Sequence, residues 1–273
     1  MQGPAADQEI PKLGFGTYGR IGDAGVAAIR LALETGYRHL DTAQSYGTER
    51  ECGEAIRQSG LKRAEVFVTT KIDTGNLGPG KVLPSLEKSL DALRVDQVDL
   101  TLIHWPAPNG SLPLALYLDQ LAEARAKGLS RLIGVSNFPV ALLAKARSLL
   151  GEGQITTNQF ECNPLFRNEK LANYCRDAGI LVTCYLPIAR GGLRGIAAAE
   201  LVAARHGADV SQIAVAYELA KGYAAIPTSS RADRIVSNFA ASRLTLSSED
   251  MVAIGNLPQS SRRIDPDWGP DWD

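Results

Sequence analysis

Residues 66–105, VFVTTKIDTGNLGPGKVLPSLEKSLDALRVDQVDLTLIHW, contain the pattern that decides the fold. The runs 66–72 and 98–105 are short and nearly continuously apolar, as in parallel strands that are buried on both faces. Between them, residues 84–95 place apolar side chains at the i, i+3, i+4 and i+7 spacing of an amphipathic helix. The stretch therefore predicts a strand, a crossover helix and a second strand parallel to the first.

The same alternation extends along the chain in both directions. Short apolar runs with strand character lie at residues 13–17, 37–43, 66–72, 98–105, 131–137, 155–161, 180–186 and 224–230. Eight strand-and-helix units predict a (β/α)8 TIM barrel of the α/β class, with an open doubly wound sheet as the competing architecture. We expect a single domain over residues 1–273. Its tail, from about residue 258 to 273, is rich in Pro, Ser, Asp and Trp and is predicted to be irregular.

The bulk composition narrows the possible partners. Lys and Arg total 29 against 30 for Asp and Glu, so the net charge of -1 provides no long-range attraction to nucleic acid or to an anionic membrane. No apolar run reaches the ~18 to 20 residues of a membrane span, and residues 1–10 lack the features of a signal peptide. The four cysteines form no C-x-x-C pair, which is typical of reduced thiols in a cytosol. We expect a cytoplasmic monomer that acts on a small molecule and has no metal site.

Six of the predicted strands end in side chains that can take part in chemistry. These strand-end residues are Asp41, Lys71, His104, Ser136 with Asn137, Gln159, and Tyr185. In a barrel of parallel strands, all the carboxyl ends open on the same face. We therefore expect these side chains to converge on one pocket.

Tyr46 lies five residues after Asp41 and adds a proton donor to this set. By itself, a buried Asp41–Lys71 pair would be explained equally well by a structural salt bridge. A phenol with a pKa near ~10 becomes a useful acid when a nearby cation and hydrogen bonds adjust that pKa, and Lys71 would be the cation. A lone histidine at a strand end is ordinarily satisfied by the backbone, but beside this group His104 would hydrogen-bond and orient a substrate oxygen.

One motif suggests a different nucleotide-binding fold. Gly14, Gly16 and Gly19 spell G-x-G-x-x-G, with an acidic residue roughly 20 positions further on, as in a Rossmann fold. That motif needs a hydrophobic strand before it and a helix that opens directly on the glycines. Here the preceding residues 8–13 form a poor strand, and helical periodicity starts only near residue 23. We therefore assign the glycines to the first barrel strand and its turn.

Seven motifs together resemble a known family. They are DTAQSYGTE (41–49), VTTKI (68–72), LIHWP (102–106), IGVSNF (133–138), NQFECNP (158–164), CYLPIA (184–189) and IPTSS (226–230). Their order and spacing resemble those of the aldo-keto reductases from about residue 13 to the tail, most closely the small bacterial 2,5-diketo-D-gluconate reductases, which also reduce methylglyoxal and β-keto esters. The resemblance implies reduction of an aldehyde or ketone by NADPH. Tyr46 would protonate the developing alkoxide, and Asp41 and Lys71 would lower the pKa of the Tyr46 phenol. His104 would position the carbonyl.

The resemblance also implies a cofactor site and the walls of a substrate pocket. Ser136, Asn137 and Gln159 match the residues that hold the nicotinamide carboxamide, and Tyr185 matches the aromatic residue that stacks on the ring. The expected contacts for the pyrophosphate, the 2′-phosphate and the adenine are Leu186, Ser229, Arg231, Arg234 and Asn238. The expected substrate contacts are Tyr18, Trp105 and the C-terminal tail.

Two of these positions depart from the family pattern. Thr228 stands where the family commonly has Lys, which removes one cation from the 2′-phosphate site. Arg231 and Arg234 remain, and a guanidinium group suits a phosphate, so NADPH is expected with NADH as the alternative. Leu186 stands where the family often has a Ser that contacts the pyrophosphate.

Two other functions remain open at this point. A barrel lyase or epimerase would use Lys71 as a base or a Schiff-base amine, because this fold supports many chemistries, but it would not require Tyr46. A non-catalytic sensor would bind NADPH and dock to a partner. Its mark in the sequence would be the loss of one of the four catalytic residues, and all four are present.

Overall fold

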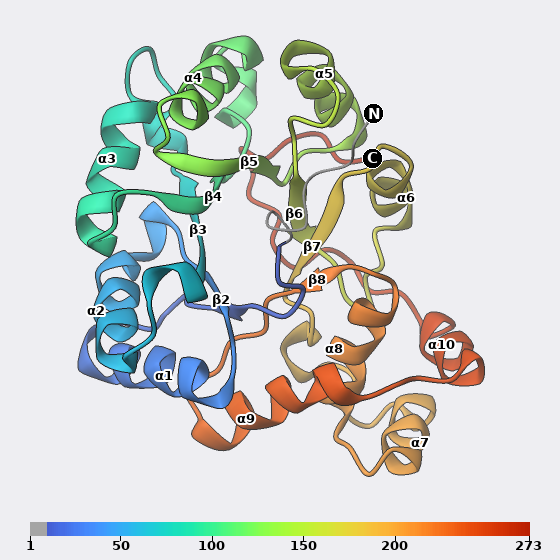
Figure 1. Cartoon of the computed structure of the whole chain (residues 1–273). Helices are drawn as coiled ribbons and strands as arrows, with labels where there is room; N and C mark the ends of the chain where they lie inside the picture. The colour runs from blue at the N-terminus through green and yellow to red at the C-terminus, as the bar shows by residue number, and fades with distance from the viewer. Residues whose placement is uncertain (1–9) are drawn as a thin grey trace.

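The computed structural model describes residues 10–273. The prediction that no signal peptide is present concerns residues 1–10, of which 1–9 lie outside the described residues. Eight strands form one parallel sheet in sequence order, and helices surround it (Figure 1). The strands are β1 (Phe15–Gly16), β2 (His39–Asp41), β3 (Phe67–Ile72), β4 (Val98–Ile103), β5 (Ser130–Ser136), β6 (Thr157–Glu161), β7 (Leu181–Tyr185) and β8 (Ala224–Ala225).

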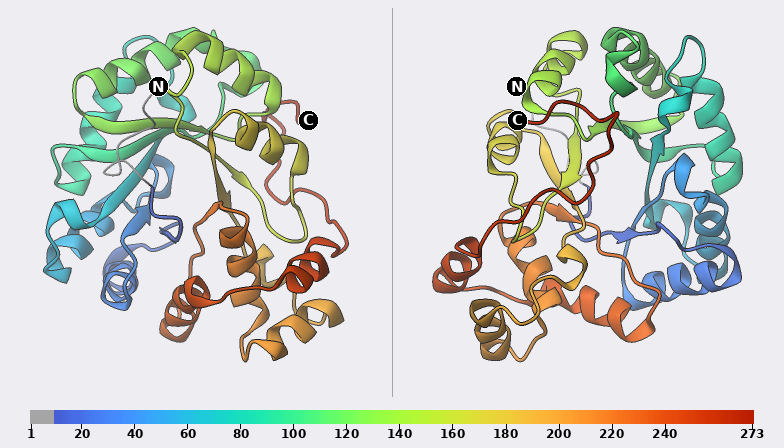
Figure 2. Two further views of the ribbon diagram at one scale, coloured as in Figure 1. Left: turned by 45° about the vertical axis from the view of Figure 1, so that its right-hand side comes forward. Right: turned by 180° about the vertical axis from the view of Figure 1, so that it is seen from behind.

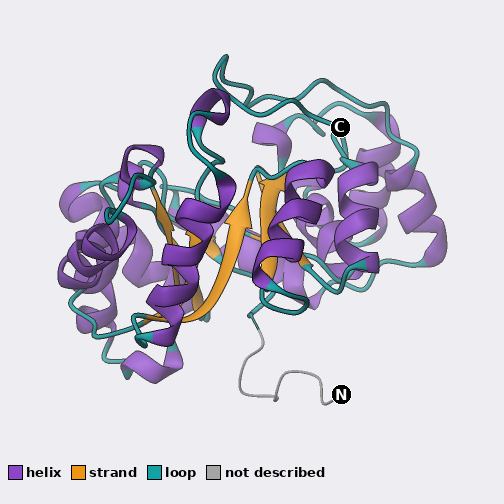
Figure 3. Ribbon diagram, turned by 90° about the horizontal axis from the view of Figure 1, so that it is seen from above, coloured by secondary structure: helices purple, strands orange, loops and turns teal. Residues whose placement is uncertain are grey.

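The helices alternate with the strands up to β7, where two helices follow one another. The α-helices are α1 (Gly22–Thr35), α2 (Glu49–Ser59), α3 (Val82–Leu93), α4 (Leu114–Ala126), α5 (Val140–Leu150), α6 (Glu169–Asp177), α7 (Ala197–Arg205), α8 (Val210–Ala220), α9 (Ala232–Ala240) and α10 (Ser248–Gly255). Figure 3 shows the strands enclosed by these helices. Within residues 10–273, none of the helices combines the length and the apolar character that a membrane crossing needs.

The sheet closes on itself next to the glycines of the G-x-G-x-x-G sequence. Leu13 forms a parallel bridge with Ala225, and the Gly14 amide donates to the Ala225 carbonyl at 3.0 Å. A Cβ atom on Gly16 would lie only 2.9 Å from the carbonyl oxygen of Ile226, so the contact requires glycine. These bonds confirm the predicted barrel, exclude the open doubly wound sheet, and place Gly14 and Gly16 at its closure.

The alternation of side chains along each strand explains the position of the polar residues. Strand residues two apart face the same side of a sheet. Phe67 in β3 packs with Leu100 and Leu102 of β4 in a cluster inside the barrel, and Lys71 lies on the same side of β3 as Phe67. The other side of each strand packs against the helices in the main core. Apolar residues therefore fill one end of the barrel, and polar residues occupy the carboxyl end.

The C-terminal tail contains no helix or strand from residue 258 onward. In the right-hand view of Figure 2, this red segment runs across the barrel. The backbone amide of Asn109, in the loop after β4, donates to the Trp268 carbonyl at 3.3 Å. At its end, the Asp273 carboxylate accepts from the Val140 amide at 2.9 Å, at the start of α5. The tail is thus attached at several points around the strand ends.

Candidate active site

A cavity of about 310 Å³ lies at the carboxyl ends of the strands. The predicted site residues that line it are Tyr18, Asp41, Tyr46, His104, Trp105, Ser136, Asn137, Gln159, Tyr185 and Leu186. Lys71 is fully buried and contacts this group through Asp41 and Tyr46. The structure therefore brings together all the residues that end the predicted strands.

The buried ion pair of Asp41 and Lys71 is fully supported by hydrogen bonds. Lys71 Nζ donates to Asp41 Oδ1 at 2.5 Å and to the Thr42 carbonyl at 2.9 Å. The second carboxylate oxygen accepts from Gln159 Nε2 at 2.8 Å. Burial lowers the pKa of Lys71, but the Asp41 charge and then Tyr46 outweigh burial, and the net pKa is raised. The ammonium group therefore stays charged.

Tyr46 ends the short 3-10 helix η2 (Gln44–Tyr46), which follows β2. Its hydroxyl lies 3.5 Å from Lys71 Nζ, and Nζ lies 4.8 Å from the centre of the ring. The expectation that Asp41 and Lys71 both lower the phenol pKa holds for Lys71 and is wrong for Asp41, and burial outweighs the effect of Lys71. Burial raises the pKa of Tyr46, Lys71 lowers it by less, and the Asp41 carboxylate raises it further. The phenol therefore keeps its proton at neutral pH.

His104 follows β4 directly and faces Tyr46, with 5.5 Å between the ring centres. Burial, and then the charge of Lys71, lowers the pKa of His104 to about 3, so the ring is neutral. Its Nδ1 lies 3.3 Å from the hydroxyl of Ser45, a residue that the sequence analysis did not select. The other two histidines lie elsewhere: His39 bonds Thr69 inside the barrel, and His206 pairs with Asp250.

The strands from β5 to β7 contribute neutral groups to the same cavity. Asn137 has a left-handed backbone with φ of 61° and donates through its amide N–H to the Gln159 carbonyl at 2.8 Å. Its side-chain oxygen accepts from the Tyr185 hydroxyl at 2.9 Å, and its side-chain nitrogen donates to the His104 carbonyl at 3.0 Å. The Ser136 hydroxyl also donates to the Gln159 carbonyl, at 2.8 Å. The amide and hydroxyl groups are thus held in fixed orientations.

The residues expected around the 2′-phosphate lie outside this cavity, on the loop after β8 and on α9. The Arg231 guanidinium forms two bonds with Asp233, including Nη2 to Oδ2 at 2.6 Å, and both side chains are exposed. The Ser229 hydroxyl accepts from the Arg231 amide, Arg234 is exposed, and Asn238 is buried. These four residues share one segment of chain beside the cavity.

Aromatic side chains form the walls at the mouth of the cavity. Tyr18 is 68% exposed and packs edge-on against Tyr46, with 5.2 Å between the ring centres. Trp105 is buried against two rings of the tail, with 5.4 Å to Trp268 and 6.0 Å to Trp272. The tail therefore covers the side of the cavity that Trp105 forms.

Glu161 is a second residue that the sequence analysis missed. This fully buried residue ends β6, and its Oε2 accepts from the backbone amides of Arg263 at 2.9 Å and Ile264 at 3.0 Å. Ile264 lines the cavity. The signal was available in the sequence, because Glu161 is two positions after Gln159 and faces the same side of the strand.

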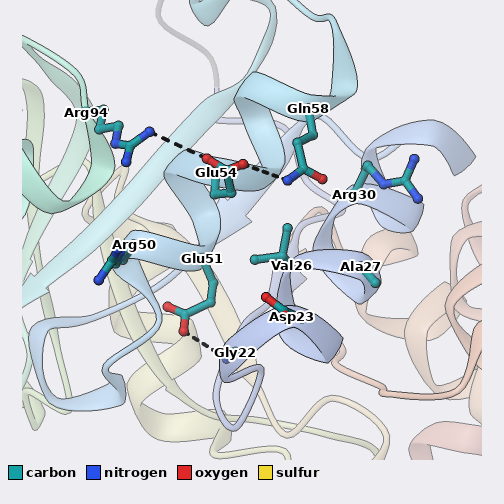
Figure 4. A pocket seen from close by; sticks show the side chains of 10 residues that line it. All are labelled: Gly22, Asp23, Val26, Ala27, Arg30, Arg50, Glu51, Glu54, Gln58 and Arg94. Atoms are coloured by element: carbon teal, nitrogen blue, oxygen red, sulfur yellow. Dashed lines mark hydrogen bonds and ion pairs between the residues drawn. The ribbon is translucent and has the colours of Figure 1, made fainter.

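A wider groove of about 560 Å³ lies between α1 and α2 on the outer surface (Figure 4). Within it, Glu54 accepts from Gln58 at 2.6 Å and pairs with Arg94 at 3.5 Å. Glu51 accepts from the Gly22 backbone amide at 2.9 Å. The groove contains none of the predicted site residues, whereas the cavity at the strand ends is lined by ten of them and is therefore the candidate active site.

The fold and the site define a barrel enzyme with one cavity at its strand ends, around a tyrosine, a histidine and a buried lysine–aspartate pair. Residues 12–257 match the family described as Aldo/keto reductase family. The chain belongs to this family. It is therefore an oxidoreductase that acts on carbonyl groups, in a family that generally uses NAD(P)H.

Several known proteins are similar over nearly the whole chain. The methylglyoxal reductase DkgB of Escherichia coli O157:H7 is 40% identical over 265 residues, which cover 97% of this chain and 99% of that protein. An aldo-keto reductase of Mycobacterium sp. (strain KMS) is 36% identical, with 94% and 92% covered. A crystal structure described as a 2,5-diketo-D-gluconic acid reductase B has a TM-score of 0.92 at 35% identity, covering 97% of this chain and 94% of that one. The aldose reductase of Giardia lamblia has a TM-score of 0.87 at 31% identity, with 93% and 95% covered.

Proposed function

We propose that the protein reduces small aldehydes and ketones to alcohols with NADPH and uses Tyr46 as the general acid. The observation that carries the proposal is the placement of a protonated phenol 3.5 Å from a buried, charged Lys71 and beside a neutral His104. Methylglyoxal, 2,5-diketo-D-gluconate and β-keto esters are the proposed substrates. The names of two similar proteins support the first two of these.

The described residues fit a nicotinamide cofactor. Thr228 Oγ1 is buried in the cavity wall, has no hydrogen-bond partner within the described part of the chain, and offers a polar contact. Ser136, Asn137 and Gln159 would hold the carboxamide, and the Tyr185 ring would lie against the nicotinamide. When bound, NADPH supplies the hydride that reduces the carbonyl carbon.

The side chains of this protein would handle the carbonyl oxygen. The Tyr46 hydroxyl donates its proton to that oxygen as negative charge develops on it, and the nearby Lys71 ammonium stabilises the phenolate that remains. If His104 accepts from Ser45 at Nδ1, its hydrogen lies on Nε2, and Nε2 can donate to the same oxygen. Trp105 and the tail exclude water from one side of the cavity.

The choice of NADPH rests on Arg234, Ser229 and Asn238, with Leu186 beside the pyrophosphate. Arg231 contributes less than the sequence suggests, because Asp233 occupies its guanidinium group. We therefore expect Asp233→Asn to raise the kcat/KM ratio of NADPH over NADH by about threefold to tenfold, since it frees one guanidinium for phosphate. Arg234→Met should lower the same ratio. If the NADPH-to-NADH ratio were the same in both variants and in the wild type, the 2′-phosphate would not bind at Arg231 and Arg234.

Oxidation of NADPH in the presence of each proposed substrate, followed by the absorbance of the reduced nicotinamide, tests the activity. The proposal expects turnover with at least one of the three. Tight NADPH binding without turnover on any carbonyl would favour the sensor. Borohydride-dependent labelling of Lys71 by a carbonyl substrate without NADPH would favour the lyase or epimerase, because it traps a Schiff base.

A further inference from the structure

Two cysteines and a glutamate meet on the outer side of the barrel, away from the candidate active site. Cys184 lies in β7, Cys162 directly follows β6, and Glu218 lies on α8, which packs against the neighbouring strand β8. All three are 0% exposed. In β7 the neighbouring Thr183 bonds Thr157 of β6, so Cys184 faces the opposite side of the strand, toward the helix. The cluster is therefore sealed between the barrel wall and α8.

The spacing of the three side chains matches a metal-binding geometry. Glu218 Oε2 lies 3.7 Å from Cys184 Sγ and 3.9 Å from Cys162 Sγ, and all the donor atoms lie within 4.8 Å of one another. A tetrahedral zinc site with Zn–S of about 2.3 Å and Zn–O of about 2.1 Å has ligand-to-ligand distances of about 3.5 to 3.8 Å. Small side-chain movements would bring the three donors to one ion.

Glu218 lacks the partners that a buried carboxylate needs. Among residues 10–273, its buried Oε1 has no hydrogen-bond partner, and its Oε2 contacts only the two weakly donating thiols. Burial raises the pKa of Glu218 to about 7, against the opposing charge of Lys221. The buried Asp41 carboxylate differs, because Lys71 donates to one of its oxygens and the Gln159 amide donates to the other.

We propose that Cys162, Cys184 and Glu218 bind one thiophilic divalent cation, such as Zn²⁺. The ion is held by two thiolates and by one or both carboxylate oxygens, and binding through both oxygens gives four donor atoms. The ion takes the place of the two thiol protons and of any proton on Glu218, which pass to solvent, and nothing is oxidised or reduced. Two thiolates, one carboxylate and a divalent ion leave a net charge of -1, and the Lys221 ammonium balances it.

Cobalt(II) provides the direct test, because thiolate ligation gives it a near-ultraviolet charge-transfer band. The full-length wild-type protein, produced with cobalt under reducing conditions, should contain one cobalt per chain and show this band. Added Zn²⁺ should remove it. Cys184→Ser and Glu218→Gln should each weaken binding by at least about tenfold. Cys52→Ser, which changes a buried cysteine on α2, should bind as the wild type does.

Several results would overturn the proposal. They are wild-type protein without stoichiometric cobalt or without the band, wild-type cobalt affinity in Cys184→Ser, and equal losses of affinity in Cys184→Ser and Cys52→Ser. The first would mean that the thiols only hydrogen-bond a carboxylic acid. The wild-type spectrum decides the matter even if a variant fails to fold. Carbonyl turnover is a separate readout, so a protein that oxidises NADPH but binds no cobalt contradicts the metal site and leaves the proposed function intact.

Discussion

The two halves of the candidate active site are built from different chemistry. The half on β2 to β4 carries ionisable groups, with Asp41 and Lys71 buried as an ion pair and Tyr46 beside them. The half on β5 to β7 lines the cavity with amides and hydroxyls, and its one carboxylate, Glu161, bonds the backbone of the tail. Besides the backbone pairing of β4 with β5, side-chain hydrogen bonds link the halves, from Gln159 to Asp41 at 2.8 Å and from Asn137 to the His104 carbonyl at 3.0 Å.

This difference separates two tasks. Charged groups at fixed distances can move or stabilise a proton, because each pKa depends on its neighbours. Neutral groups with fixed donors and acceptors can hold a polar ring without changing its charge. The comparison therefore predicts that changes in the charged half lower turnover and changes in the neutral half weaken cofactor binding.

A Tyr→Phe substitution in each half should give the largest difference between the halves. Tyr46→Phe, in the charged half, is expected to have the larger effect. Removing the phenol hydroxyl removes the proton donor and leaves the ring in place. We expect kcat to fall by roughly 10²- to 10⁴-fold, while the dissociation constant for NADPH changes by less than about threefold. Steady-state kinetics and fluorescence titration measure the two quantities. A variant that keeps most of its kcat would show that another group is the acid.

Tyr185→Phe is the matched change in the neutral half. It removes the hydrogen bond to Asn137 and leaves the ring that would lie against the nicotinamide. A lost neutral hydrogen bond costs about 1 kcal/mol, so we expect NADPH binding to weaken by about fivefold and kcat to change by less than about threefold. If the loss fell mainly on kcat, the two halves would not be separable.

Glu161→Gln tests whether the tail belongs to the substrate side of the site. The change replaces a carboxylate whose oxygen accepts hydrogen bonds from two backbone N–H groups of the tail. We expect the substrate KM to rise by about twofold to tenfold with kcat little changed, and the tail to be cleaved faster by a protease. Glu152→Gln, at an exposed side chain, is the control and should match the wild type. Unchanged KM with faster cleavage would limit Glu161 to a structural role.

The smallest effect is expected from pH. His104, with a pKa of about 3, is already neutral, and the raised pKa of Tyr46 keeps the phenol protonated. Reduction would decline only as pH falls through the His104 value or rises through that of Tyr46. Between about pH 5 and 9, kcat at saturating NADPH and substrate should therefore be flat. A step near 6.5 would mean that His104 titrates as an ordinary histidine.

The strands and their polar ends were predictable, because a short, nearly continuous apolar run and the polar residue that follows it are local features of the sequence. Lys71 and His104 each lie at the end of a mainly apolar run, and the parallel barrel then brings such ends together. The glycines at positions 14 and 16 were also assigned correctly, since no helix follows them at once.

Other features depend on tertiary packing and could not be read from the sequence. The sign of the pKa shift of Tyr46 follows from burial, which only the folded loops determine. The partner of Glu161 lies about a hundred positions away in an irregular tail, so no spacing announces it. Cys162, Cys184 and Glu218 come from two strand segments and a helix, which is why a search for C-x-x-C finds nothing.

The course of the tail also matters for protein engineering. Residues 258–273 cover the mouth of the cavity but belong to no strand of the barrel, and their backbone is attached through Glu161, Asn109 and Leu165. A library that varies positions between these attachment points would alter the cavity wall while the barrel ladder stays intact. Such variants would share one barrel and one proton donor and differ only in this short tail segment. They could then be screened for activity on carbonyl compounds of different shapes.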